Sequence, residues 1–304
     1  MDSLVALLPW LIPVFLLLSI LEGIDVWIDD KRNAGAATQT RTFSLRDTVG
    51  NYVTYWINTF TKVAAQYVLP FSVVVVGSAV TPLHLAARHW WVWVAGLVVT
   101  DFCYYWAHRG DHRIRLLWTA HSVHHSSTYF NLSTNLRLPW FHPVADTVRS
   151  LAWLPAALLG FPPPMIFLLY AVGLIFQIPC HTKRIGKLWR PIEFVFNTPS
   201  HHRVHHGSNK PYIDKNYGGV FIIWDRMFGS YAEELEPVRY GLIHDIATDN
   251  PLKYNYLETA AMVRDVARAN TWGARIGHVF GPPGWSESPA ADARPLVSST
   301  PSSA

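Results

Sequence analysis

Nine of the fifteen histidines in this 304-residue chain lie within residues 108–125 and 201–206. Eight of them form one HxxxH box and two HxxHH boxes, namely His108 and His112, then His121, His124 and His125, then His202, His205 and His206. Side chains three and four positions apart share one face of a helix. If each box is helical, its imidazoles point to a common region. Eight imidazoles gathered there would have room for two metal ions, so the spacing predicts a catalytic multi-histidine metal centre.

Other metal sites fit these boxes less well. A structural zinc site needs about four ligands, and a haem takes at most two axial ligands. The HExxH pattern of the commonest zinc proteases is absent. Imidazole suits zinc, copper, iron and nickel alike, so the spacing by itself leaves the metal open.

Two more histidines are additional ligand candidates. The third box has a recognisable helix start, with Thr198 as N-cap and Pro199 in the first helical position. His201 precedes His202 directly and points roughly 100° away from it on such a helix, which favours a supporting or structural role. His181 closes an apolar hairpin and could reach the metal site from another direction.

Three acidic side chains near the boxes also need an explanation. Asp101 stands seven residues before His108, on nearly the same face of a predicted helix. Its carboxylate could accept the second N–H of a ligand imidazole and so orient the ring; the alternatives are an arginine partner or a helix cap. An acid inside an apolar span is costly, so we expect the orienting role. Asp111 and Glu193 are expected to be solvated or paired surface charges.

Four apolar stretches predict an all-α integral membrane protein with several spans. The chain is 50% hydrophobic and 15% charged, more apolar than an ordinary soluble domain. The stretches cover residues 3–21, 63–87, 90–107 and 150–180. The first is about long enough to cross a bilayer, and it lacks the basic start and cleavage site of a signal peptide. Prolines interrupt the last stretch, and each of its halves is short for a full crossing, so we expect a hairpin that enters the membrane and returns.

Basic residues predict how the chain is oriented. The net charge of +4 could indicate a nucleic-acid partner, but basic residues also gather beside membrane spans on the cytoplasmic side, and we expect no nucleic acid. Here they lie between the first two spans and after the third, which places all three boxes on the cytoplasmic face. Cys103 and Cys180 form no close pair, so neither a disulfide framework nor a thiolate metal site is indicated.

We expect four regions along the chain. Residues 1–89 would hold the N-terminal spans and a linker, and residues 90–245 the catalytic domain. Residues 246–280 would form a helical extension, because "LETAAMVRDVARAN" is amphipathic. Residues 281–304 are small, polar and proline-bearing, and we expect this tail to be disordered.

The boxes, the block "NTPSHHRVHHGSN" and the following "YIDKNYGGVFIIWDRMFGSY" resemble the fatty-acid hydroxylase and sterol desaturase superfamily. "YFNLSTNLR" and "RYGLIH" are similar to its alkylglycerol monooxygenase and C-5 sterol desaturase branches. The resemblance covers roughly residues 90–245. It implies a membrane di-iron oxygenase in which the eight box histidines hold two iron ions at the cytoplasmic face. Related chains usually have an acid soon after the histidine that corresponds to His181. This chain has Lys183 there and so departs from the family pattern.

The resemblance also implies an activity, the oxidation by O2 of an unactivated C–H bond in a lipid. A desaturation of the C-5 sterol desaturase type is the leading expectation. The alternative is a lipid hydroxylase that cleaves ether lipids, as in the alkylglycerol monooxygenase branch. A non-enzymatic alternative is a membrane protein that binds or transports metal. Because no GxGxxG stretch or other reductase signature occurs, the electrons should come from a separate donor protein.

Overall fold

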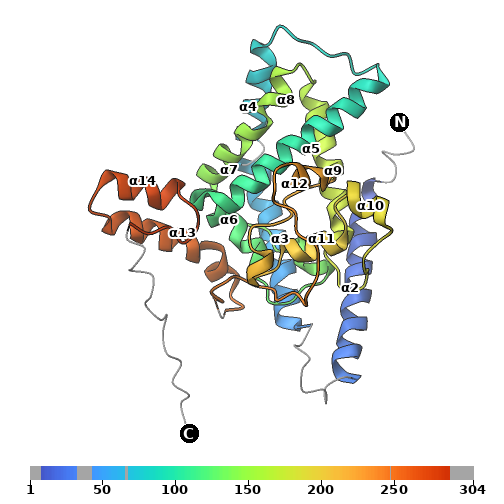
Figure 1. The fold of residues 1–304 in the computed structure, drawn as a ribbon, viewed down its shortest axis with the longest axis vertical. Helices are drawn as coiled ribbons and strands as arrows, with labels where there is room; N and C mark the ends of the chain where they lie inside the picture. The colour runs from blue at the N-terminus through green and yellow to red at the C-terminus, as the bar shows by residue number, and fades with distance from the viewer. Residues whose placement is uncertain (1–7, 33–42, 66–67, 247, 288–304) are drawn as a thin grey trace.

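The computed structural model describes residues 8–32, 43–65, 68–246 and 248–287 (Figure 1). Within these ranges the fold is helical, without a β-strand; the isolated bridge Phe196–Phe221 is the only β-type pairing. The expected all-α class is confirmed there. In chain order the helices are α2 (Leu8–Arg32), α3 (Leu45–Ala65), α4 (Val68–Val80), α5 (Trp90–Arg113), α6 (Arg115–His125), η1 (Leu132–Leu136), α7 (Pro143–Ser150), η2 (Leu151–Trp153), α8 (Leu154–Leu158), α9 (Pro163–Gln177), η3 (Ile178–Cys180), α10 (Arg190–Val195), α11 (Pro199–His205), η4 (Lys210–Tyr212), α12 (Ile223–Met227), α13 (Pro251–Arg268) and α14 (Trp272–Phe280).

Helices α5 and α6 form the centre of the fold, with α2 on one side and the pair α13 and α14 on the other (Figure 1). Helix α5 packs along α9 around buried Val92, Met165 and Ile166. Gly96 permits this close approach, since a Cβ there would lie 2.9 Å from Leu169 Cδ1. Helix α5 begins where the third apolar stretch begins and continues to Arg113, so the first histidine box lies on its last turns.

The second apolar stretch, residues 63–87, is not one helix. Helix α3 ends at Ala65, α4 ends at Val80, and the chain up to Trp90 contains no further helix. Pro82 explains the end of α4, because proline lacks the N–H that the helix would need and disfavours helical geometry in the residue before it. The expectation of a continuous span here is therefore wrong.

The fourth stretch is a hairpin, but its two halves differ. The first half is broken into η2 and α8, whereas Pro163–Cys180 is 18 residues long and apolar enough to cross a membrane by length and composition. The expectation that both halves are short is therefore wrong for the second half. The turn between them requires Gly160, whose φ is +87° and whose Cβ would lie 2.5 Å from the Leu83 carbonyl oxygen.

The two ends of the chain are described in part. Helix α2 begins at Leu8 and continues past the apolar stretch of residues 3–21 to Arg32; residues 1–7 lie outside the described ranges. Of the tail expected to be disordered, residues 288–304 also lie outside them. Pro163–Cys180 is the one helix in the described part that meets the length and composition of a membrane span.

Candidate metal centre

All three histidine boxes lie on helices, as predicted. The first is at the end of α5, and Ile114, in an extended conformation, turns the chain into α6, which carries the second box. The third is on α11, where Thr198 is the N-cap and Pro199 the first helical residue. Helix α6 packs back on α5, which brings the first two boxes together.

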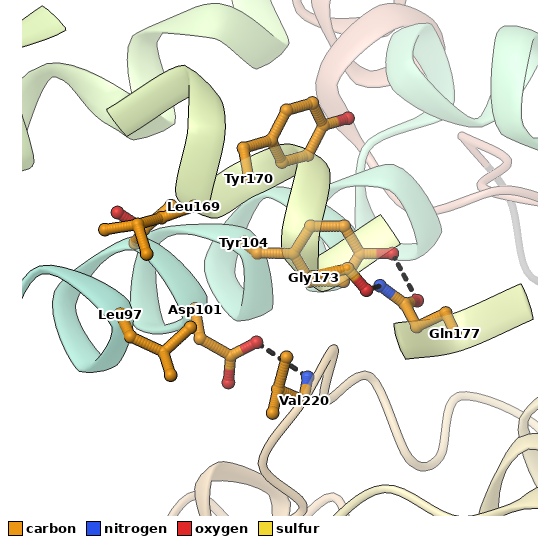
Figure 2. Close-up of a pocket in the computed structure, with 9 residues that line it drawn as sticks. Leu97, Asp101, Tyr104, Leu169, Tyr170, Gly173, Gln177 and Val220 are labelled. Carbon is orange, nitrogen blue, oxygen red and sulfur yellow. Dashed lines mark hydrogen bonds between the residues drawn. The ribbon is translucent and has the colours of Figure 1, made fainter. Parts of the chain in front are cut away.

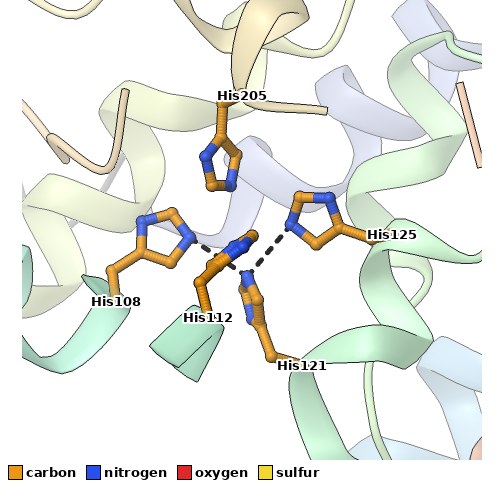
Figure 3. Close-up of side chains that lie close together, drawn as sticks. All are labelled: His108, His112, His121, His125 and His205. Atoms are coloured by element: carbon orange, nitrogen blue, oxygen red, sulfur yellow. Dashed lines mark hydrogen bonds between the residues drawn. The ribbon is translucent and has the colours of Figure 1, made fainter. Parts of the chain in front are cut away.

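Nine histidines form two groups in which one nitrogen per residue lies within 4.8 Å of all the others. The five-histidine cluster consists of His108, His112, His121, His125 and His205 (Figure 3). The four-histidine cluster consists of His124, His181, His202 and His206. Neighbouring residues point about 100° apart on a helix, so the pairs His124–His125 and His205–His206 each contribute one ring to each cluster. The eight box histidines and His181 are thus brought together.

Ring nitrogens approach each other closely in both clusters. His121 Nε2 is 3.1 Å from Nε2 of both His108 and His125 (Figure 3). In the four-histidine cluster the Nε2 atoms of successive rings are 2.9 to 3.2 Å apart, in the order His124, His181, His202 and His206. With metal–nitrogen bonds of about 2.1 Å, ligands about 90° apart are separated by about 3.0 Å, and ligands at the tetrahedral angle by about 3.4 Å. The observed separations match ligands about 90° apart better than ligands at the tetrahedral angle.

Backbone carbonyls fix the tautomer of four rings. The pairs, Nδ1 to oxygen, are His108 with Tyr217 at 2.8 Å, His205 with Lys215 at 3.1 Å, His181 with Gln177 at 3.1 Å and His124 with Arg137 at 3.4 Å. A carbonyl oxygen only accepts, so each Nδ1 carries the proton and each Nε2 presents a lone pair. Two such lone pairs face each other between His181 and His124.

These observations fit a cation in each cluster. Facing lone pairs repel unless a positive charge lies between them. His112 Nε2 and His205 Nε2 are buried and have no hydrogen-bond partner, and a metal ion would satisfy both nitrogens. A ligand imidazole typically donates its other N–H to a carbonyl or carboxylate, which is what four of the rings do.

Burial also keeps these imidazoles in the form that binds metal. Desolvation is the main cause that lowers the pKa of the second-box and third-box histidines, and for His124 the pKa falls to about 4. The rings are therefore neutral at pH 7, as metal ligation requires. Acidification below these pKa values would put protons in competition with the metal.

Asp101 supports the five-histidine cluster indirectly. Its carboxylate accepts hydrogen bonds from the backbone N–H groups of Val220 (2.7 Å) and Phe221 (3.0 Å) and from Trp224 Nε1 (2.9 Å); Figure 2 shows the Val220 bond. The expectation that it orients a ligand ring by direct contact is wrong, because seven residues place it about 10 Å along the helix from His108. Asp101 instead holds the loop whose Tyr217 carbonyl contacts His108.

The loop from Tyr217 to Asp225 has a second carboxylate anchor. Asp225 accepts hydrogen bonds from the backbone N–H groups of Tyr217 (2.8 Å) and Gly218 (2.7 Å). Gly219 is required because a Cβ there would lie 2.7 Å from Asp101 Oδ1. The paired glycines of "DKNYGG" are the sequence signal for this close backbone packing.

Two acids lie beside the five-histidine cluster. Asp111 Oδ2 is 3.8 Å from His121 Nδ1, and Asp214 Oδ1 is 3.8 Å from His112 Nδ1. Asp111 is paired with Arg149 at 2.7 Å, as a paired charge was expected to be, but it is buried and not on the surface. The sequence prediction missed this role because Arg149 is 38 residues away.

His201 belongs to neither cluster. It is buried, and its Nε2 lies 3.1 Å from Glu193 Oε2. The adjacent His202 points into the four-histidine cluster. The structure therefore places buried His201 beside the partly buried carboxylate of Glu193, outside the metal centre.

The four-histidine cluster is braced from the N-terminal helices. Glu22 of α2 accepts hydrogen bonds from the Thr182 hydroxyl, next to His181, and from the Leu132 backbone. Asp47 of α3 forms a buried ion pair of 2.7 Å with Arg137, whose carbonyl contacts His124. These connections span 90 or more residues of sequence and were not predicted.

Comparison with known proteins agrees with this geometry. Residues 93–230 match the fatty acid hydroxylase family. Human alkylglycerol monooxygenase is 38% identical over 195 residues, which cover 64% of this chain and 43% of that protein. An ornithine lipid hydroxylase of Rhizobium tropici is 32% identical over 146 residues (47% and 43%), and lathosterol oxidase of Mus musculus 32% over 144 (45% and 44%).

The chain spans less than half the length of these relatives. No solved structure matches it. The matched relatives are oxidoreductases by name, and residues 93–230, which match the fatty acid hydroxylase family, include both clusters.

Proposed function

We propose that this chain is a membrane-bound di-iron monooxygenase that hydroxylates an ether lipid of the alkylglycerol class. The observation that carries the proposal is the pair of buried clusters, in which nine neutral imidazoles present nitrogens to two common points. The alkylglycerol monooxygenase match is longer and more identical than the lathosterol oxidase match. The relatives therefore favour the hydroxylase alternative over the sterol desaturation that the sequence put first.

The proposed reaction balances with two external electrons. A C–H bond, O2, two electrons and two protons give a C–OH group and water. Bound iron would supply the activation of O2. At the carbon beside an ether oxygen, the product is a hemiacetal, which separates into a fatty aldehyde and a glycerol. The substrate therefore loses its ether bond.

The nine clustered histidines would hold two iron ions, five at one and four at the other. Neutral imidazoles add no charge to the centre, and burial of both clusters excludes water from the reacting atoms. His201 is left out of this ligand set because it pairs with Glu193. Asp101 keeps the supporting role that its contacts to the loop from Val220 to Trp224 indicate.

An apolar crevice between α5 and α9 supports a lipid substrate. Leu97, Leu169 and Gly173 line this crevice of about 10 Å³. Tyr104 and Gln177 also line it and are joined by a hydrogen bond (2.9 Å, Figure 2). The Tyr104 ring is 5.3 Å from the His108 ring. We infer that a lipid chain approaches the clusters from this side, which requires the crevice to widen.

Exposed apolar helix faces support a membrane location with several spans. Val14, Leu18 and Ile24 of α2 are half exposed, as are Val94 of α5 and Leu168 of α9. Large exposed apolar surfaces of this kind are rare on soluble proteins. The distribution of basic residues supports a site on the cytoplasmic face.

Iron-loaded protein incubated with a 1-O-alkylglycerol, ¹⁸O2 and a chemical reductant tests the proposal. We expect a fatty aldehyde and free glycerol, with the label in the trapped aldehyde, and no product from His124→Ala. A parallel incubation with lathosterol is expected to leave it unchanged. Loss of two hydrogens from the sterol with an intact ether lipid would refute the proposal.

A metal-transport role is disfavoured by the contacts of Asp101. A transport path needs free polar ligands within the spans, and Asp101 is the one acid of the 90–107 stretch. Its oxygens are already occupied by Val220, Phe221 and Trp224.

A further inference from the structure

A stack of side chains leads from the four-histidine cluster to the protein surface. The centroid of the Phe130 ring lies 5.0 Å from that of His206 and 5.8 Å from that of His181. The Tyr240 ring lies on Phe130 at 4.6 Å, with an angle of 4° between the ring planes. The Lys183 ammonium nitrogen lies over the Tyr240 ring, 5.3 Å from its centroid. No step of the proposed hydroxylation uses this stack, so it needs a separate explanation.

Burial along the stack decreases from the cluster outward. Phe130 is 2% exposed, Tyr240 is partly buried and Lys183 is exposed. Among the described residues, Phe130 is the one ring other than a histidine that contacts the four-histidine cluster. The five-histidine cluster is contacted by several such rings, including Trp118 and Tyr217. The four-histidine cluster therefore depends on a single aromatic ring for its cover on this side.

The backbone around Tyr240 is fixed from two directions. On one side, the Ser208 N–H donates a hydrogen bond of 2.7 Å to the carbonyl of Arg239. On the other side, Gly241 has a φ of +98°, and a Cβ there would lie 2.9 Å from Thr128 Cγ2. Glycine adopts this φ without strain and leaves room for the close approach. The Tyr240 ring is thus held between the end of the third box and the segment that leads to the stacked phenylalanine.

The contacts within the stack restrict both ring motion and water access. Aromatic rings attract each other at centroid separations of about 4.5–7 Å, so Tyr240 limits the motion of Phe130. The Lys183 ammonium adds a cation–π contact to the Tyr240 ring. A metal ion leaves a buried site when a ligand ring turns away or when water reaches the ion. An apolar ring held against two ligand imidazoles opposes both events.

We propose that Tyr240 is a positioning residue of the metal centre, which acts through Phe130 to hold two ligand rings of the four-histidine cluster and to slow the release of its ion. These rings are His181 and His206. Tyr240 lies outside residues 93–230, so this role does not come with the family match. The inference rests on the proposed function only for the metal ion at this cluster, and it does not depend on the lipid or on the reaction.

The test follows the anaerobic release of Fe²⁺ to the chelator ferrozine from the whole iron-loaded chain in detergent. In Tyr240→Ala we expect one of the two ions to leave at least about tenfold faster than in the wild type. Tyr240→Phe keeps the stack, so both ions should leave at the wild-type rates. Lys183→Glu should quicken release of the same ion about two- to fivefold, because the cation–π contact is lost.

The matched control is Tyr256→Ala on α13. This tyrosine also stacks on a histidine, at 5.4 Å, but that histidine, His142, belongs to neither cluster. Both ions should therefore leave at the wild-type rates. Two ligand variants identify the affected ion. Tyr240→Ala should quicken release in a His205→Ala background, which keeps the four-histidine ion, and should not do so in a His206→Ala background.

Several results would overturn the proposal. These are unchanged release in Tyr240→Ala, an equal acceleration in Tyr256→Ala, and an acceleration that appears in the His206→Ala background. If Tyr240→Ala does not fold, wild-type release in Lys183→Glu would overturn it instead. A wild-type chain without an ion at the four-histidine cluster would overturn this proposal and the proposed function together. Two slowly released ions without ether-lipid cleavage would count against the proposed function alone.

Discussion

The five-histidine and four-histidine clusters share the same helices but are supported by different parts of the chain. The first is braced by Asp101, Asp225 and the loop from Asp214 to Val220, all within the residues that match the family. The second depends on Glu22 of α2 and Asp47 of α3, which lie outside the match. The matched residues thus supply all nine clustered histidines, whereas elements outside the match position one of the two sites.

The clusters also differ in charge. Asp111 and Asp214 lie 3.8 Å from ring nitrogens of the five-histidine cluster. In the described ranges, no acid lies within salt-bridge distance of a four-histidine ring. A carboxylate near a ligand ring makes it more basic, so the two bound ions should not be equivalent.

The largest effects should come from removing one ring of an adjacent pair. His205→Ala and His206→Ala are each expected to reduce hydroxylation by at least about a hundredfold, because both metals are needed. Metal analysis should show the loss of one ion in each variant, and iron spectroscopy should show different remaining sites. Identical spectra from the two variants would show that His205 and His206 do not belong to different metal sites.

Breaking the buried ion pair of the four-histidine side should have the next largest effect. Asp47→Ala leaves the buried Arg137 unpaired, and we expect about 3–5 kcal/mol of destabilisation. Because the Arg137 carbonyl contacts His124, the four-histidine cluster should lose its metal first. Thermal unfolding and metal content check this, with Asp265→Ala, which removes a half-exposed partner of Arg115, as a milder control. If the five-histidine cluster lost its metal first, the proposed difference in how the two clusters are supported would be contradicted.

The fold class and the helical boxes could be predicted because they depend on local spacing. The start of α11 at Thr198 and Pro199 is an example, since a cap acts over one helical turn. The roles of Asp47 and Asp111 could not be predicted, because their arginine partners are far along the chain. Helical spacing placed Asp101 on the correct face but could not show that a distant loop occupies its oxygens.

A smaller effect is expected from disturbing the loop beside the five-histidine cluster. Gly219→Ala places a methyl group 2.7 Å from Asp101 Oδ1, and Asp101→Asn weakens charge-assisted bonds worth about 1.5–3 kcal/mol each. Both variants should weaken metal binding at the five-histidine cluster about 10-fold to 100-fold. Gly186→Ala, which meets no atom within 4 Å, is the matched control. Unchanged affinity in Gly219→Ala, measured by chelator competition, would argue against loop support.

The smallest effect should follow Glu22→Gln on the opposite side. The amide keeps an oxygen for the Thr182 hydroxyl but loses the charge and the second oxygen that accepts from the Leu132 N–H, so we expect about 1 kcal/mol of destabilisation. Chelator competition should show weaker binding at the four-histidine cluster only. Equal loss of metal affinity at both clusters would show that Glu22 does not support the four-histidine cluster specifically.

The central claim is that each histidine cluster holds one iron ion. The iron content of the purified protein, combined with X-ray absorption at the iron edge, tests it most directly. The claim predicts two iron ions per chain, each with a shell dominated by imidazole nitrogen, and one ion remaining in both His205→Ala and His206→Ala. One ion or none in the iron-supplied wild type, or a shell dominated by carboxylate oxygen, would contradict it.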